Sequence, residues 1–311
     1  MNADHSQSID FQVRTAAFEW LGQQVDIHGE VLPRSLLEGG FLFQNKRIPL
    51  VSPQGIFKPQ ILNIPLSITT APKGPYNDGY DKKSGFIFYK YRGTDKNHRD
   101  NVGLRNAYEK GVPLIYFHGI MPGKYMAVWP VYIVSDDPQN LTFHIAVDDA
   151  ANISLVDNSN LTVDRFSDHG TEARRLYITA TVRKRLHQRS FRERVLKAYR
   201  EQCALCRLRH LELLDAAHIV PDSNPEGEPV IKNGIALCKL HHAAFDNFII
   251  GITPDYAIEV RQDILEEEDG PMLQHGLKEL HSQRIILPGS KNNWPDQELL
   301  DKRYQQFKQV I

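Results

Sequence analysis

The sequence has no long hydrophobic run, which excludes a membrane-spanning helix. No stretch approaches the roughly 18 apolar residues that such a helix needs. The first residues are polar and lack the apolar core of a signal peptide. We therefore expect a cytoplasmic protein that does not bind membranes. With 311 residues, 41% hydrophobic and 24% charged, the chain is long enough for two ordinary globular domains.

Cysteine is scarce, and all three cysteines stand at metal-ligand spacing. Cys203 and Cys206 are separated by two residues, as are Cys238 and His241. Each pair can supply half of a tetrahedral shell for Zn²⁺. The alternative is three small buried hydrophobic residues, but chance pairing of every cysteine beside a histidine is improbable. We predict a structural Zn²⁺ on these four residues, which fits the reducing interior of a cell better than disulfides do.

The chain also lacks an excess of positive charge. Its 37 basic and 38 acidic residues give a net charge of −1, whereas nucleic-acid-binding proteins are often basic. Positive charge is nevertheless concentrated between residues 174 and 200, just before the first cysteine pair. A run of this kind is usually a solvated helix face, but its position next to the predicted zinc site favours contact with phosphates. We assign DNA-backbone contacts to Arg183, Lys184, Arg185 and Arg189.

A histidine, an asparagine and a histidine–aspartate pair follow one another around the second half of the zinc site. A short apolar run predicts a strand that carries His218 at its end, because Pro221 stops it. Asn233 precedes a glycine, and His242 opens a short helix that places Asp246 on the same face. Together with the cysteine pairs, this order resembles the HNH nuclease family.

The HNH resemblance implies a role for each residue. His218 would be the general base, because a neutral imidazole can take a proton from the attacking water near neutral pH. His242 and Asp246 would hold a catalytic Mg²⁺ or Mn²⁺. Many HNH proteins carry an acid or a histidine directly before the base, where this chain has alanine, so Asp215 is included as a further candidate ligand. Asn233 would pin the loop that carries the base or help to position the metal; a plain Asn-Gly turn is the alternative.

The organisation predicted for the chain is a mixed α+β protein. We expect a polar tail over residues 1–17, a β-rich domain over 18–181 and a zinc-containing ββα-metal domain over 182–311 with further C-terminal helices. The β-rich part contains many short strand patterns, including one at residues 176–180, and one helix near 100–110; regular spacing suggests a barrel. A basic amphipathic helix is expected at 183–201, and two more near 272–281 and 296–310.

A segment of the first domain resembles the SET- and RING-associated (SRA) family, which has a PUA-type barrel. The residues that carry the resemblance lie between 75 and 117, beginning with Pro-Tyr-Asn-Asp-Gly-Tyr-Asp and continuing through the predicted helix. By this resemblance, Tyr76, Asp78 and Tyr91, with Tyr89 as another possible wall, would bind a flipped modified cytosine such as 5-methylcytosine. Aromatic faces can stack on the base and a carboxylate can accept its exocyclic amine. The alternative is that these tyrosines pack within the barrel.

Taken together, the two resemblances predict a McrA-type, modification-dependent restriction endonuclease that acts on double-stranded DNA. A single HNH site cuts one strand at a time, so a double-strand break would need a homodimer or two successive nicks. Two alternatives stay open at this point. One is an HNH nickase or repair nuclease with another DNA specificity, and the other is a non-catalytic zinc-dependent DNA-binding protein.

Overall fold

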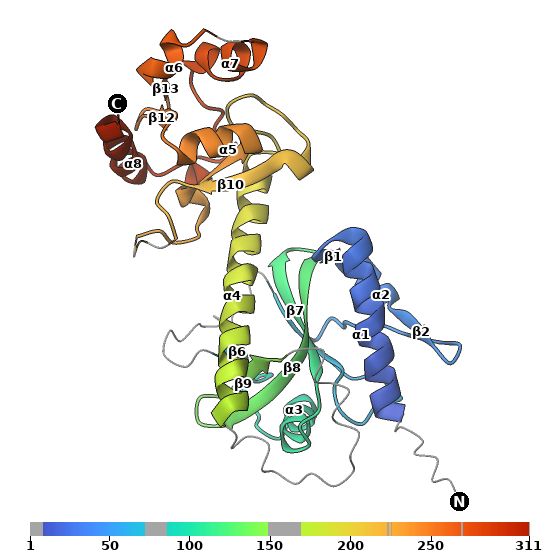
Figure 1. The fold of residues 1–311 in the computed structure, drawn as a ribbon. Coiled ribbons are helices and arrows are strands. Elements are labelled where there is room, and N and C mark those ends of the chain that lie inside the picture. Colours follow the sequence, from blue (N-terminus) through green and yellow to red (C-terminus); the bar gives the residue numbers. More distant parts are fainter. Residues whose placement is uncertain are drawn as a thin grey trace, which may run out of the picture. The chain divides into compact units, whose positions relative to one another are not determined.

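The computed structural model describes residues 9–71, 86–148, 169–222, 224, 226–268 and 270–310. By internal contacts the chain divides into a first unit, Met1–Leu186, and a second unit, His187–Ile311. The boundary falls a few residues beyond the one expected from the sequence. Both units mix helices and strands (Figure 1). Each unit has its own hydrophobic core.

One open sheet of seven strands dominates the first unit. Its order is β4-β5-β7-β8-β9-β6, and β1 pairs with β8. Only β5 and β7 run parallel. A closed barrel requires β4 and β6 to pair, and within the described residues they do not. The predicted SRA/PUA-like barrel is therefore not shown. The strands are β1 (Val31–Pro33), β4 (Ile56–Phe57), β5 (Ser67–Thr70), β6 (Ile87–Lys90), β7 (Leu114–Met121), β8 (Lys124–Asp137) and β9 (Thr142–Val147).

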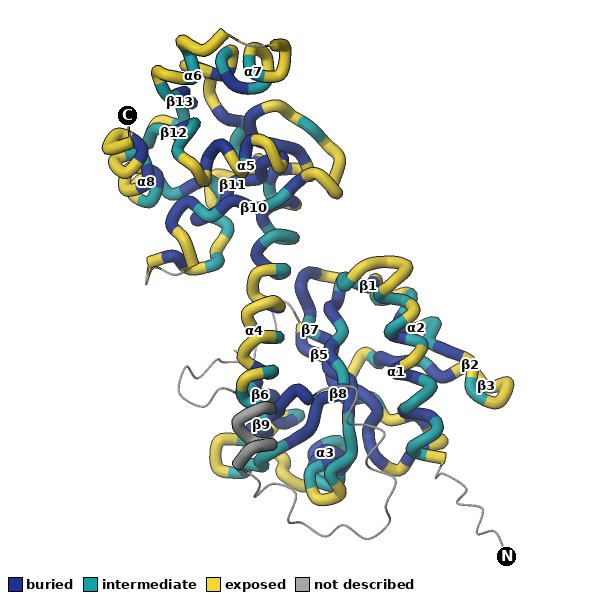
Figure 2. Tube along the Cα trace, viewed as in Figure 1, coloured by how far each residue is buried: buried dark blue, intermediate teal, exposed yellow. Residues whose placement is uncertain are grey.

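Both faces of this sheet are covered, which explains its continuous apolar runs. Along β7, Leu114 and Tyr116 enter one core cluster, whereas Ile115 and Phe117 enter the cluster on the opposite face. Strands buried on both faces read as unbroken hydrophobic segments, and Figure 2 shows β7 mostly in dark blue. Helix α3 (Arg99–Glu109) contacts β8 and lies where the sequence predicted a helix. The remaining elements of this unit are α2 (Arg34–Gly39) and the hairpin of β2 (Phe41–Phe43) and β3 (Lys46–Ile48).

Helix α1 (Ile9–His28) corrects the expectation of a polar tail over residues 1–17, because residues 9–17 are helical. Val13, Ala17 and Leu21 recur every four residues and are fully buried. Arg14 is also buried and donates to the carbonyl oxygens of Pro65 and Pro113 at 3.0 and 2.9 Å. Residues 1–8 lie outside the described part of the chain.

Strand β8 runs without a break through Pro130. Its residues up to Met126 pair with β1, and those from Val131 onward pair with β9. Proline has no backbone N–H to give to a neighbouring strand, and here it stands between these two pairings. The carbonyl oxygen of Pro130 still accepts a hydrogen bond from the N–H of Asp148 at 3.1 Å.

Helix α4 (His169–Ala198) begins well before the expected start at residue 183, so the strand predicted at residues 176–180 is wrong. Residues 177–182 of this helix, Tyr-Ile-Thr-Ala-Thr-Val, are rich in β-branched and aromatic residues, which favour strands locally. Tertiary packing decides otherwise: Ile178, Val182 and Leu186, spaced by four, pack against the first unit's core. Thr179 is completely buried, and its hydroxyl accepts a hydrogen bond from the N–H of Val147 at 2.8 Å.

The second unit contains a ββα element. Strand β10 (Leu214–His218) pairs antiparallel with β11 (Gly234–Cys238), and helix α5 (Lys239–Asp246) contacts both. The last turns of α4 and the residue that follows it complete the core with Phe191, Val195, Leu196 and Tyr199. The predicted C-terminal helix is confirmed as α8 (Gln297–Val310). The helix expected near 272–281 is shorter, because it ends at Gly276 and continues as a 3₁₀ turn at Lys278–Leu280.

Further short elements complete the second unit. They are a hairpin of β12 (Ile250–Ile252) and β13 (Ile258–Val260), α6 (Gln262–Glu266), α7 (Pro271–Gly276), and 3₁₀ turns at Leu211–Leu213, Ile231–Asn233 and Lys291–Asn293. No helix in the described part of the chain is long and apolar enough to span a membrane.

Candidate nuclease site

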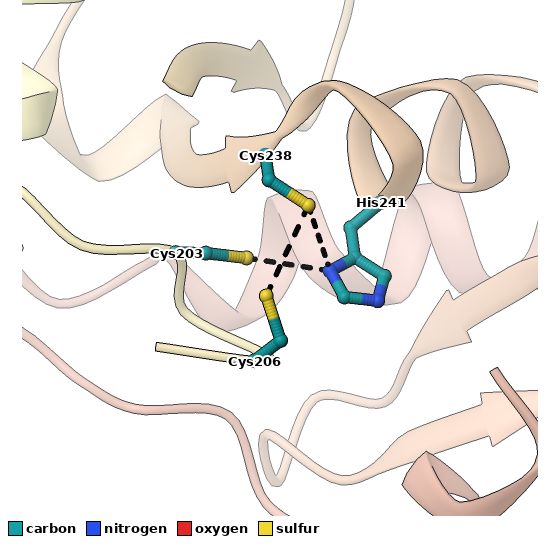
Figure 3. Close-up of side chains that lie close together, drawn as sticks. All are labelled: Cys203, Cys206, Cys238 and His241. Atoms are coloured by element: carbon teal, nitrogen blue, oxygen red, sulfur yellow. Dashed lines mark hydrogen bonds between the residues drawn. The ribbon is translucent and has the colours of Figure 1, made fainter. Parts of the chain in front are cut away.

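Four predicted ligands, Cys203, Cys206, Cys238 and His241, come together in the second unit (Figure 3). Their ligand atoms all lie within 4.8 Å of one another. The Sγ atoms of Cys206 and Cys238 are 3.9 Å apart, and His241 Nδ1 lies 3.4 and 3.2 Å from the sulfur atoms of Cys203 and Cys238. Sulfur atoms in a disulfide are about 2.05 Å apart, whereas two sulfurs on one tetrahedral zinc are about 3.8 Å apart. This group could therefore hold a metal.

A backbone carbonyl from helix α7 orients the histidine of this group. His241 Nε2 lies 2.7 Å from the carbonyl oxygen of Gly276. With the Nε2 proton donated to that oxygen, Nδ1 is left free to face the three sulfurs, which is the usual arrangement behind a metal-bound histidine. No sequence pattern predicts this contact, because Gly276 lies far beyond the cysteine pairs and contributes only a main-chain atom.

His218 ends strand β10 and stacks on Phe191 of helix α4. Their ring centroids are 3.9 Å apart, with an angle of 21° between the planes. The Nε2 atom of His218 is buried and makes no hydrogen bond within the described residues. Burial lowers the pKa of His218 below its usual value of 6.5, although the negative charges of Asp222, Asp246 and Asp215 oppose this shift. The side chain is thus held as a neutral imidazole near neutral pH.

Asn233 fastens the segment that follows His218. Its side chain is fully buried and accepts a hydrogen bond from the N–H of Val220 at 2.9 Å. It also donates to the carbonyl oxygens of Val220 and Glu228 at 3.0 and 3.1 Å. Gly234 is extended and starts β11, so the plain Asn-Gly turn is not what these residues form. These contacts tie Asn233 to Val220 and Glu228, both in the segment that joins β10 to β11.

His242 lies between the two carboxylates that were proposed as metal ligands. Its Nδ1 is 3.7 Å from Asp215 and its Nε2 is 3.3 Å from Asp246. Helix α5 begins three residues before His242 rather than at it, and His242 and Asp246 share one of its faces. Among the described residues, these three side chains do not form a second compact group of metal ligands like the Cys3His group. Of the two carboxylates, that of Asp246 lies closer to the His242 ring.

Some basic side chains of α4 are exposed to solvent, and others donate hydrogen bonds to main-chain carbonyl oxygens. Lys184 and Arg185 are exposed, and Arg185 forms an ion pair with Glu30. Arg189 is half-buried. The backbone of Arg183 belongs to the helix, but its side chain lies outside the described part. Arg192 and Arg194, which the sequence grouped with the same positive run, instead donate to main-chain carbonyl oxygens of the second unit.

The residues proposed to bind a base are only partly described. Tyr76 and Asp78 lie outside the described residues. Tyr89 and Tyr91 are 7% and 1% exposed and belong to the core of the first unit. Tyr91 stacks on Phe143 at 4.5 Å between ring centroids, and its hydroxyl contacts Asp136 and Arg105.

A pocket of about 380 Å³ opens elsewhere in the first unit, beside the part of β8 between its two pairings. Neither Tyr89 nor Tyr91 is among the residues that line it. Among the described residues that line it, Trp129 is aromatic and Glu30, Asp148 and Arg185 are charged.

Comparison with known proteins identifies the second unit's central segment. Residues 203–253 match a family model described as HNH endonuclease. This range includes the Cys3His group, His218, Asn233, His242 and Asp246. No curated protein matches the chain. The chain therefore contains an HNH endonuclease domain, and the protein is a nuclease.

Two solved structures are similar at low scores. One is described as a modification-dependent TagI restriction endonuclease, with 16% identity, a TM-score of 0.28, and 78% of this chain and 81% of that chain covered. The other is described as the type IV phosphorothioation-dependent restriction endonuclease ScoMcrA, with 16% identity, a TM-score of 0.20, and 78% of this chain and 54% of that chain covered. Scores of this size do not establish a shared fold.

Proposed function

We propose that the protein is a metal-dependent DNA endonuclease in which His218 is the general base. The observation that carries this proposal is the imidazole of His218, which lies in the segment matched by the HNH model, stacks on Phe191 and interacts electrostatically with Asp215, His242 and Asp246. With the ring proton on the buried Nε2, Nδ1 accepts a proton from the water that attacks phosphorus. Phe191 fixes the ring plane, and Asn233 holds the segment that follows it.

The catalytic metal in this proposal is Mg²⁺ or Mn²⁺, held by His242 and Asp246 with Asp215 nearby. Such an ion, when bound, neutralises a phosphate oxygen and stabilises the leaving oxygen. Oxygen and imidazole ligands suit these hard ions, whereas three thiolates and one imidazole suit Zn²⁺. We accordingly assign Zn²⁺ to the Cys3His group as a structural ion, which needs no open coordination position there.

We further propose that cleavage depends on a modified cytosine in double-stranded DNA, as in restriction enzymes of the McrA type. The support is the likeness of residues 75–117 to the SRA family. In this proposal Tyr76 and Asp78 bind the flipped base, and the buried Tyr89 and Tyr91 form the wall behind it. The exposed basic residues of α4 contact the phosphates. A homodimer, or two successive nicks, would give a double-strand break in the cytoplasm.

Cleavage of matched duplexes tests this function. We expect the protein, loaded with Zn²⁺ and supplied with Mn²⁺, to cut duplexes carrying 5-methylcytosine or 5-hydroxymethylcytosine and to leave the unmodified duplex intact. His218→Ala should reduce the rate by about 10²- to 10⁴-fold, the usual contribution of a general base. Products are resolved on denaturing and native gels, which separate nicks from double-strand breaks.

The control is His210→Ala, which removes an exposed histidine of the same unit and should keep full activity. Equal cutting of all three duplexes would remove the dependence on modification and favour a nickase or repair nuclease. Unchanged cleavage by His218→Ala would contradict the assignment of the base.

A further inference from the structure

A row of five charged or titratable side chains crosses the proposed catalytic site. Asp246 presents one oxygen to His242 at 3.3 Å and the other to Arg303 at 3.8 Å. Asp215 presents one oxygen to His242 at 3.7 Å and the other to Arg192 at 3.5 Å. Each carboxylate therefore has an imidazole on its inner side and a guanidinium on its outer side. The two arginines come from α8 and α4.

Arg303 is held more firmly than an arginine that merely pairs with a surface carboxylate. It is 7% exposed, and its guanidinium carbon lies 4.6 and 4.4 Å from the ring centroids of Phe245 and Phe248. Its Nη2 donates to the carbonyl oxygen of Phe245 at 2.8 Å. Its Nε is buried and makes no hydrogen bond within the described residues. A buried charge costs free energy unless it is compensated. The carbonyl oxygen and the two aromatic rings compensate it in this one position, so they hold the guanidinium there.

The position of Arg303 bears directly on Asp246. Phe245 and Asp246 are the last two residues of α5, where main-chain carbonyl oxygens have no partner within the helix. A cation at this end satisfies a carbonyl and complements the helix dipole. The same guanidinium lies beside the Asp246 carboxylate, which is half-exposed and would otherwise be free to rotate into solvent. Arg303 stands far outside residues 203–253, the segment matched by the HNH model.

We propose that Arg303 is a positioning residue of the catalytic metal site: it holds the outer oxygen of Asp246 so that the inner oxygen and His242 Nε2 face the same ion. This inference rests on the proposed function of His242 and Asp246. Arg192 has the corresponding place at Asp215, where it also donates to the carbonyl oxygens of Leu211 and Leu214 at 2.9 and 2.8 Å. Groups behind a metal ligand commonly contribute about 10- to 100-fold to metal affinity.

The test measures metal binding and cleavage separately. Mn²⁺ binding to the zinc-loaded full-length protein is followed by electron paramagnetic resonance, and cleavage is titrated with Mn²⁺. We expect Arg303→Met to raise both the dissociation constant and the half-saturating concentration of Mn²⁺ by about 10- to 100-fold. The rate at saturating Mn²⁺ should fall much less. Arg303→Lys, which keeps the charge, should recover part of the affinity.

Phe307→Leu is the matched control, because Phe307 is a fully buried residue of the same helix and packs against Gly251. It should lower the melting temperature and leave Mn²⁺ affinity unchanged. Wild-type Mn²⁺ affinity in Arg303→Met, or an equal loss of affinity in Phe307→Leu, would overturn the inference. If the wild-type protein binds Mn²⁺ but cuts no DNA, the proposed function fails while the role of Arg303 is still decided by the binding data.

Discussion

At the scale of single residues, His218 owes its chemistry to its neighbours rather than to its position in a motif. The ring of Phe191 covers one face at 3.9 Å, and burial leaves Nε2 without a hydrogen bond among the described residues. Removing water from an imidazole disfavours its charged form. The same contact therefore orients the ring and keeps it neutral, and both are needed in a base that accepts a proton from water.

The lowered pKa of His218 predicts the pH dependence of cleavage. Only the neutral ring can act, so kcat/KM should fall tenfold per pH unit on the acid side, with an apparent pKa below 6.5. Phe191→Leu should move this limb toward 6.5, because it exposes the ring. Asp222→Asn should move it the other way, because Asp222 raises the pKa. The measurement is kcat/KM between pH 5 and 8. If the apparent pKa on the acid side is the same in both variants as in the wild type, His218 is not the titrating group.

At the scale of elements, the site depends on the close approach of helix α4 to strand β11. A methyl group on Gly234 would lie 2.5 Å from Val195 Cγ2 and 2.8 Å from Phe191 Cζ. The absence of a side chain at Gly234 lets the helix pack directly on the strand, and this packing brings Phe191 to His218. The glycine of the Asn-Gly pair is thus required by space and not by turn geometry.

Gly234→Ala should therefore harm both stability and catalysis. Overpacking of this kind costs about 1–3 kcal/mol, and a displaced Phe191 would release the ring of His218. Chemical denaturation followed by fluorescence, together with the cleavage rate, measures the two effects. Gly22→Ala, in helix α1, provides the comparison, since nothing lies within 4 Å of the added methyl group. That variant should not destabilise the protein.

At the scale of the whole molecule, the Cys3His group joins parts of the second unit that are distant in the sequence. Cys203 and Cys206 follow α4, Cys238 and His241 lie at the junction of β11 and α5, and Gly276 of α7 contacts His241. A metal here closes long chain segments into one unit. Structural zinc commonly contributes about 10 kcal/mol or more to the folding of such domains.

Loss of this metal should unfold the second unit selectively. We expect Cys238→Ser to reduce bound zinc by one equivalent, measured by elemental analysis, and to make residues beyond 187 sensitive to protease while the first unit resists. Cleavage activity should be lost and not restored by Mn²⁺ alone. Proteolysis that attacks both units equally, or full zinc content in the variant, would contradict the assignment.

The sequence by itself determined the features that depend on short spacing. The cysteine pairs, the strand that ends in His218, the helix that aligns His242 with Asp246, and helices α3 and α8 all follow from neighbours along the chain. Their physical cause is local, because ligand reach, strand alternation and helical periodicity act over a few residues.

Only the tertiary structure decided what depends on distant contacts. Residues 176–180 are helical because Ile178 and Val182 pack against the core of the first unit, whose strands lie earlier in the sequence. This packing outweighs the preference of these residues for strands. The burial of Tyr91 and the approach of Phe191 and Arg303 to the nuclease site are likewise set by long-range packing. No local pattern specifies these contacts, because their free energy arises only when the chain has folded.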